Sequence, residues 1–152
     1  MACRVQQADF DVDRELQAFC GGGTQTGAVV SFVGLVRDQL EGDDRIHALS
    51  LEHYPGMTER VLANIERQAR ERWDLEDVLI VHRVGCLQPG DRIVLVMTGS
   101  AHRGEAFAAC EFLMDHLKTK APFWKKEDTD SGSHWVEAAS SDDQAVNRWQ
   151  RS

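Results

Sequence analysis

The chain has 152 residues, which is enough for one domain with a substantial hydrophobic core. Its formal net charge of −8 argues against a nucleic-acid-binding protein, because such proteins carry a basic surplus. No apolar run approaches the length of a membrane span, the first residues lack the apolar core of a signal peptide, and the four cysteines show no CxxC spacing. We therefore expect a single-domain cytoplasmic protein with free thiols, no metal site and no membrane contact.

Hydrophobic periodicity and turn residues divide the chain into helices and strands. In chain order we predict a helix from Asp11 to Cys20, strands at Gly27–Val36 and Ile46–Tyr54, a helix from Pro55 to Trp73, strands at Val78–Val84 and Arg92–Thr98, a helix from His102 to Thr119, extended segments at Phe123–Lys126 and His134–Ala138, and a helical turn or two within Asp142–Trp149. The order αββαββαββ indicates an α+β fold, in which an antiparallel or mixed sheet carries helices on one face. Residues 1–25 form an N-terminal segment and residues 139–152 a C-terminal tail of the one domain.

Three features set the boundaries between these elements. Gly21-Gly22-Gly23 ends the first helix and Pro122 ends the third. A polar turn from Arg37 to Asp44 separates the first two strands. The third helix should bury one apolar stripe, made of Ala106, Phe107, Cys110, Leu113, Met114 and Leu117.

All four lysines lie within nine residues, Lys118 to Lys126, whereas thirteen arginines provide the other basic side chains. A Lys ammonium loses its proton readily when it is desolvated or placed beside other cations, and an Arg guanidinium does not. Clustered lysines can therefore donate protons, accept them or act as nucleophiles. The alternative is a solvated turn at a helix end. Phe123 and Trp124, between the two lysine pairs, favour a functional segment, and they either line a pocket or pack in the core.

Two further segments are candidate binding sites. Gly99–Arg103 precedes the third helix, where free N–H groups and a partial positive charge make His102 and Arg103 a candidate phosphate or carboxylate site. Alternatively, Ser100 caps this helix, Arg103 lies on the surface and His102 is a turn residue with its hydrogen bonds satisfied. The other segment is Gly34–Arg37, where a buried strand ends and an Arg enters a polar loop.

The spacing of these candidates predicts a homodimer. His102 and Lys118 are sixteen residues apart on one helix, so a rise of 1.5 Å per residue separates them by about 24 Å. They can line one small pocket only if a second copy of the chain brings the start of its helix to the end of the first. A two-fold interface would create two equivalent sites of this kind.

Four segments, in this order, together resemble the catalytic large subunit of molybdopterin synthase: Leu51–Met57 (LEHYPGM), Val81–Gly85 (VHRVG), Gly99–Arg103 (GSAHR) and Lys118–Glu127 (KTKAPFWKKE). The likeness runs from about Gly27 to Trp149. It implies an α+β fold with a hammerhead-like subdomain and a homodimer that binds a small ubiquitin-like subunit at each end, giving a heterotetramer. It also implies a sulfurtransferase of molybdenum cofactor biosynthesis that requires no cofactor. The thiocarboxylated Gly-Gly tail of the small subunit would give sulfur to cyclic pyranopterin monophosphate, forming the dithiolene of molybdopterin.

The resemblance also assigns candidate residues. It implies that Lys118 and Lys125 are catalytic, whereas Lys120 supplies general positive charge. The substrate-binding set it implies is Leu35, Val36, Arg37, His102, Arg103, Lys118, Lys125, Lys126 and Glu127, with His102 and Arg103 contributed by the partner copy. It leaves the roles of His53 and His134 open.

The chemistry of these groups suits an anionic substrate, because cations offset the mutual repulsion of phosphate and thiocarboxylate. We expect Arg37, His102 and Arg103 to bind the phosphate and the pterin. Lys118 would stabilise the tetrahedral oxyanion at the tail, and Lys125 would donate or accept a proton at the pterin carbons. Two other function classes remain open, a non-catalytic binding module for a phosphorylated metabolite and an adaptor for a ubiquitin-like protein.

Overall fold

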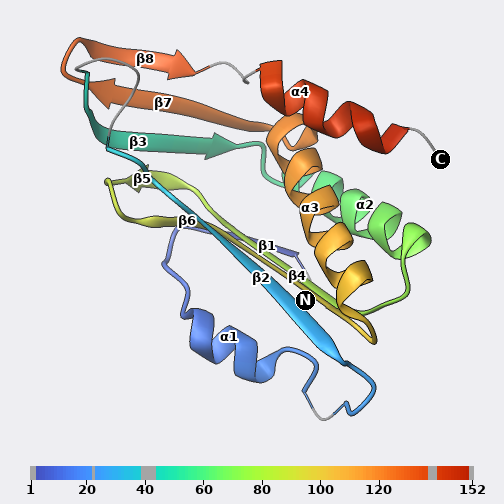
Figure 1. The fold of residues 1–152 in the computed structure, drawn as a ribbon. Helices are drawn as coiled ribbons and strands as arrows, with labels where there is room; N and C mark the ends of the chain where they lie inside the picture. The colour runs from blue at the N-terminus through green and yellow to red at the C-terminus, as the bar shows by residue number, and fades with distance from the viewer. Residues whose placement is uncertain (1–2, 22, 39–43, 137–139, 151–152) are drawn as a thin grey trace.

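Two four-stranded sheets form the framework of the computed structural model, which describes residues 3–21, 23–38, 44–136 and 140–150 (Figure 1). The first sheet has the order β1-β4-β6-β2, with strands β1 (Cys3–Gln6), β4 (Leu75–Arg83), β6 (Arg92–Ser100) and β2 (Ala28–Leu35). The second has the order β5-β3-β7-β8, with strands β5 (Gly85–Leu87), β3 (Ile46–His53), β7 (Phe123–Thr129) and β8 (Gly132–Val136). All neighbours are antiparallel except β1 and β4, which are parallel. The α+β class is confirmed, but the strands form two sheets rather than one.

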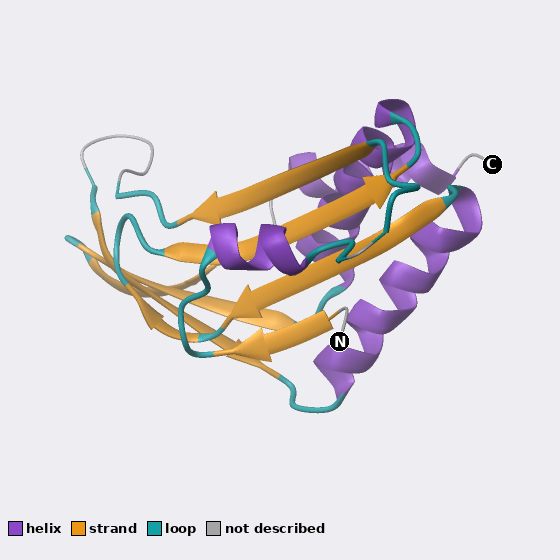
Figure 2. Cartoon of the chain, turned by 90° about the horizontal axis from the view of Figure 1, so that it is seen from below, coloured by secondary structure: helices purple, strands orange, loops and turns teal. Residues whose placement is uncertain are grey.

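Helices α2 (Met57–Arg72) and α3 (Arg103–Lys120) cover one face of the first sheet, as predicted. The short helix α1 (Val12–Ala18) lies on the opposite face, in front of the strands in Figure 2. There Phe10 and Phe19 pack against Leu79 and Leu95 of the central strands. The prediction of helices on one face is therefore correct for the long helices only. Because both faces of β4 and β6 are covered, the central residues of these strands, Val78–Val81 and Ile93–Met97, form continuous apolar runs rather than alternating with polar residues.

The second sheet has one buried and one exposed face. Its inner face contributes Leu49, Leu51 and Leu87 to a cluster that also contains Val36 and Val84, near the ends of β2 and β4. The outer face carries Trp124 and Trp135, both exposed. The junction of the two sheets is consequently lined by inward-facing residues of β7 and by the ends of β2 and β4.

Helix α3 joins the two sheets and deviates from its predicted burial at one position. The hydroxyl of buried Thr98 donates a hydrogen bond of 2.6 Å to the Ala106 carbonyl, which fixes the first turn of α3 on β6. Ala106, Cys110 and Leu113 are buried as expected, but Phe107 is 61% exposed and Met114 only half-buried. The stripe buried against the sheet is therefore narrower than the sequence pattern predicted, and the neighbouring strand β2 is the edge of that sheet.

The C-terminal tail folds back on α3 as helix α4 (Ser140–Asn147) and a 3-10 turn (Arg148–Gln150), in agreement with the predicted helical turns. Parts of the turn predicted at 37–44 and of the extended segment ending at Ala138 fall outside the described residues. Within the described part of the chain, no helix is both long enough and apolar enough to cross a membrane. The four cysteines are free thiols, and Cys110 is a buried core residue, as expected.

Candidate active site

A cavity of about 100 Å³ lies at the junction of the two sheets, beside the last turns of α3. Its floor and walls come from five elements that are distant in sequence. The residues that line it are Phe32, Gly34 and Leu35 of β2, His82 of β4, Ile93 and Val94 of β6, Met114, Leu117 and Lys118 of α3, Ala121, and Phe123 and Lys125 of β7. The lining is apolar except for two lysines and one histidine, so two cationic side chains meet at one point of an acidic protein.

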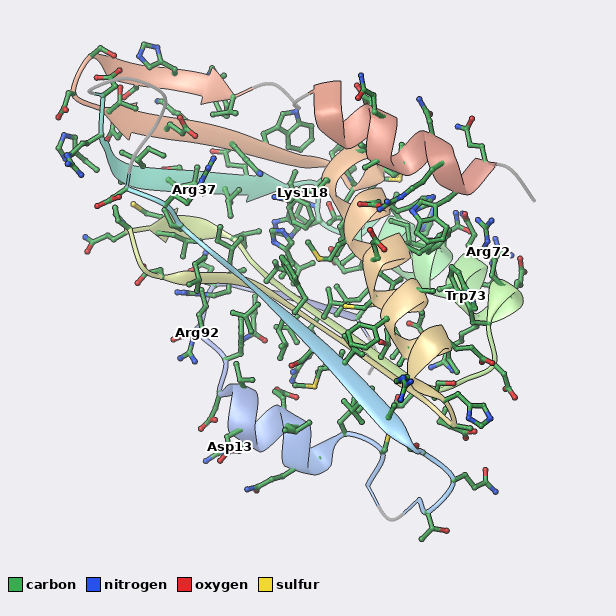
Figure 3. The ribbon with its side chains drawn as sticks, in the orientation of Figure 1. Asp13, Arg37, Arg72, Trp73, Arg92 and Lys118 are labelled. Atoms are coloured by element: carbon green, nitrogen blue, oxygen red, sulfur yellow. The ribbon has the colours of Figure 1, made fainter. Side chains whose placement is uncertain are left out.

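Lys118 and Lys125, the two catalytic candidates, meet at this cavity from different elements. Lys118 stands in the last turn of α3, where the negative end of the helix dipole favours a cation (Figure 3). Lys125 points inward because side chains alternate along β7: Phe123 and Lys125 are half-buried, whereas Trp124 is 47% exposed on the other face. Phe123 thus lines the cavity, and Trp124 belongs to neither the cavity nor the core.

The turn between α3 and β7 is held by the start of α2. The hydroxyl of the fully buried Thr58 accepts a hydrogen bond from the Tyr54 N–H at 3.0 Å and donates to the Pro122 carbonyl at 3.3 Å. This contact fixes the chain between the two lysines.

His82 forms part of the cavity wall, and the sequence reasoning did not identify it. It is 8% exposed and its ring stacks on Phe123, with the centroids 3.8 Å apart and the planes 15° apart. Burial, together with the charges of Lys125, Lys118 and His53, lowers the pKa of His82 to about 4, although the hydrogen bond to the Arg83 carbonyl acts in the raising direction. The available signal was a histidine next to Arg83 at the end of the otherwise apolar strand predicted at Val78–Val84.

The segment from Leu35 to Arg37 divides between the cavity and its surroundings. Leu35 lines the cavity and is 55% exposed. Val36 is buried, and its backbone N–H and C=O are hydrogen-bonded to Asp91 and Gly90, each at 2.9 Å, so this residue serves the framework. Arg37 is exposed beyond the end of β2, in a shallow hollow that it shares with Gly90 (Figure 3).

His102 and Arg103 lie at the other end of α3, away from the cavity of their own chain (Figure 1). His102 is the N-cap residue, its side chain makes no capping hydrogen bond, and both residues are exposed. The alternative in which Ser100 caps α3 is wrong. The Ser100 side chain is buried and donates a hydrogen bond of 2.9 Å to the Asp74 carbonyl. The first turn of α3 therefore keeps exposed basic side chains next to free N–H groups.

The remaining charged residues of the segment from Lys118 to Glu127 do not line the cavity. Lys126 lies on the outer face of β7, with its ammonium 5.8 Å from the ring centroid of Trp135. Glu127 lies on the inner face, half-buried, two residues beyond Lys125. Lys120 is exposed in the last turn of α3. Of the two histidines left open, His53 lies beside Phe123 on the neighbouring strand β3, whereas His134 lies on the exposed strand β8.

Comparison with known proteins identifies the family of this chain. The family model described as "MoaE protein" matches residues 5–120. The chain belongs to the MoaE protein family. It is 58% identical over 146 residues to the molybdopterin synthase catalytic subunit of Ralstonia nicotianae, covering 96% of this chain and 82% of that one. It is 55% identical over 146 residues to the subunit of the same name from Vibrio cholerae, covering 96% of both chains.

Solved structures share this fold over most or all of the chain. The MoaE protein of Burkholderia ambifaria superimposes with a TM-score of 0.84 at 52% identity, covering 100% of each chain. A molybdopterin synthase structure from Staphylococcus aureus gives a TM-score of 0.81 at 33% identity, covering 88% of this chain and 95% of that one. The two-sheet arrangement that encloses the lysine cavity thus belongs to a fold shared along the length of the chain.

Proposed function

We propose that this chain is the catalytic subunit of a molybdopterin synthase, a sulfurtransferase of molybdenum cofactor biosynthesis. It takes sulfur from the C-terminal thiocarboxylate of a small ubiquitin-like subunit and transfers it to cyclic pyranopterin monophosphate. The observation that carries the proposal is the meeting of Lys118 and Lys125 at one partly buried cavity, in a chain more than half identical to curated catalytic subunits.

The roles of the two lysines follow from the charges that the reaction brings together. Tail and substrate are anionic, and an oxyanion forms when the acyl carbon of the tail is attacked. Lys118, on the rim, stabilises this oxyanion, and Lys125, deeper in the cavity, transfers protons at the pterin carbons.

The rest of the substrate-binding set completes the site around these lysines. Arg37 and Leu35 approach from the end of β2, with Val36 supporting them, and Lys126 and Glu127 extend the surface along β7. His102 and Arg103 come from a second copy of the chain, because about 24 Å of helix separates them from Lys118. The assembly is a homodimer with two equivalent sites, each receiving one small-subunit tail to give a heterotetramer, and it works in the cytoplasm.

Lys118→Ala and Lys125→Ala test the proposal in a sulfur-transfer assay with thiocarboxylated small subunit. We expect each variant to lose about 100-fold or more in turnover, the usual effect of removing one oxyanion donor or one acid–base group. Lys120→Ala is the matched control, since Lys120 is on the same helix turn but outside the cavity, and it should stay near wild-type turnover. If either active-site variant is folded and turns over normally, the role given to that lysine is wrong.

Lys118→Arg separates charge from proton transfer at the same position. An Arg keeps the positive charge and cannot lose its proton, so an oxyanion-stabilising Lys118 should tolerate it better than Ala. A protein that binds both ligands but produces no molybdopterin would instead be a binding module or an adaptor.

A further inference from the structure

The proposed reaction requires a water molecule, as its atom balance demands. The thiocarboxylate of the tail carries one oxygen and one sulfur on its last carbon, whereas the released tail is a carboxylate with two oxygens. After the sulfur bonds to the pterin, an acyl–sulfur bond still joins tail and substrate. Leaving the sulfur on the pterin requires a water oxygen to attack the acyl carbon, and that water must give up a proton.

The cavity offers few groups that can take this proton. Among the described residues that line it, Lys118, Lys125 and His82 have ionisable side chains. A protonated lysine has three N–H donors and no lone pair; Lys118 is needed as a cation beside the oxyanion, and Lys125 is already assigned to proton transfer at the pterin carbons. The volume of about 100 Å³ exceeds the roughly 30 Å³ that a water molecule occupies in the liquid, so the cavity can hold water.

His82 lines this cavity, and its hydrogen bond decides which of its two ring nitrogens can accept a proton. Its Nδ1 lies 2.8 Å from the Arg83 carbonyl oxygen. A carbonyl oxygen only accepts hydrogen bonds, so the proton of the neutral ring resides on Nδ1 and the lone pair on Nε2. The stack against Phe123 fixes the ring plane. The imidazole is therefore held in one tautomer and one orientation from two sides.

We propose that Nε2 of His82 orients the water that cleaves the acyl–sulfur bond and accepts its proton. The water oxygen bonds to the acyl carbon while the proton moves to Nε2, and Lys118 stabilises the oxyanion. The carbon–sulfur bond then breaks, its electron pair stays on the sulfur, and the imidazolium returns the proton to that sulfur. Water is consumed, the tail leaves as a carboxylic acid, and His82 is neutral again.

The charges around His82 suit this order of events. Lys125 of β7, Lys118 of α3 and His53 of β3 face the ring, and β6 contributes apolar Ile93 and Val94. In the empty cavity these groups and burial keep the imidazole uncharged, which leaves Nε2 free to accept a hydrogen bond. Anionic substrate and tail offset the lysine charges, so loading the site raises the basicity of His82 when the water must be deprotonated.

The proposal rests on the proposed function. It is tested by single-turnover reactions of the His82→Asn and His82→Phe variants, in which the small subunit is then analysed by intact-mass spectrometry. Asn keeps an N–H for the Arg83 carbonyl and Phe keeps the stacked ring, but neither supplies the Nε2 lone pair. We expect sulfur to bond to the pterin while tail release slows about 100-fold or more, so that small subunit covalently joined to the pterin accumulates. In H₂¹⁸O, the tail released by the wild-type protein should gain one ¹⁸O.

His116→Asn is the matched control. Nδ1 of His116 also lies 2.9 Å from a backbone carbonyl, that of Phe112, and its ring also lies against a Phe, but it does not line the cavity. This variant should accumulate no adduct and release the tail as the wild type does.

Each other result overturns the proposal. Tail release at the wild-type rate by folded His82→Asn would show that another group accepts the proton. Loss of the first sulfur transfer without any adduct would show that His82 acts earlier or only shapes the cavity. If the wild-type protein itself transfers no sulfur, the proposed function fails first and the role of His82 falls with it.

Discussion

Two histidines of this chain make similar hydrogen bonds but have different charged neighbours, which affect their pKa values. His82 and His116 each lie within 3 Å of a backbone carbonyl and against a Phe ring. Burial lowers the pKa of both, but His82 also faces Lys118 and Lys125, and its pKa falls to about 4. A neutral, fixed imidazole beside two lysines is a polar group that the core alone would not require.

The free energy of unfolding at acid pH should depend directly on the protonation of His82. An unfolded His has a pKa of about 6.5, so between pH 6.5 and 4 the unfolded chain binds a proton that folded His82 excludes. The resulting stability is present above pH 6.5, is lost as the pH falls toward 4, and amounts to about 3 kcal/mol. Urea unfolding at pH 7 and pH 4.5, at fixed protein concentration, should show a smaller loss for His82→Phe than for wild type; equal losses would contradict the assigned pKa.

At the scale of elements, the tail is attached to the long helices by a cluster of aromatic rings. The Trp149 ring lies edge-on to Trp73 and Phe112, with centroids 5.6 and 5.5 Å away, and its Nε1 donates a hydrogen bond of 2.7 Å to Asp115 (Figure 3 labels Trp73). The guanidinium of Arg72 donates to the Trp149 carbonyl at 2.7 Å. The tail thus braces α2 and α3 against each other, on the side of α3 away from the sheet.

Trp149→Ala should therefore cost about 2–3 kcal/mol of unfolding free energy, from lost packing and one charge-assisted hydrogen bond. Trp135→Ala is the control, since Trp135 is 60% exposed on β8 and its removal should change the stability by about 0.5 kcal/mol or less. Urea midpoints of the two variants provide the comparison. Equal losses would mean that the tail does not stabilise the helices.

At the scale of the whole molecule, a complete proposed site requires two chains. Helix α3 presents lysines at one end and His102 with Arg103 at the other. A partner that brings its lysines to this helix start must also cover the next turn, where Phe107 is 61% exposed. An exposed aromatic beside an edge strand is typical of an interface.

Phe107→Glu should consequently convert a dimer into a monomer with a mass of 17.1 kDa. A buried unpaired carboxylate at the interface strongly disfavours association, and sulfur transfer should fall with it because the site loses His102 and Arg103. Light scattering and the transfer assay measure both effects, and Leu16→Glu on α1 is the exposed apolar control. A monomeric wild-type protein with full activity would overturn the shared site.

The sequence predicted well those features that depend on interactions between residues close together in the chain, and poorly those that depend on residues far apart. Long apolar or periodic segments such as Met57–Arg72 were located to within two residues, because burial of one face leaves a repeating pattern. The strand Cys3–Gln6 was not predicted, since four residues leave no period and this strand exists only by pairing with β4. The burial of Phe107 was predicted wrongly, because the helix period does not show where the sheet beneath ends.

By itself, the sequence determined the α+β class, the position of the long helices and the clustering of the four lysines, because these depend on local pattern and on residue type, while the choice of Lys118 and Lys125 came from the family resemblance. Only the tertiary structure decided that the strands form two sheets, that Lys125 faces the cavity while Lys126 faces outward, and that His82 completes the wall. The physical reason is that long-range strand pairing fixes which side of β7 is buried, and a shift of one residue would exchange the two lysines.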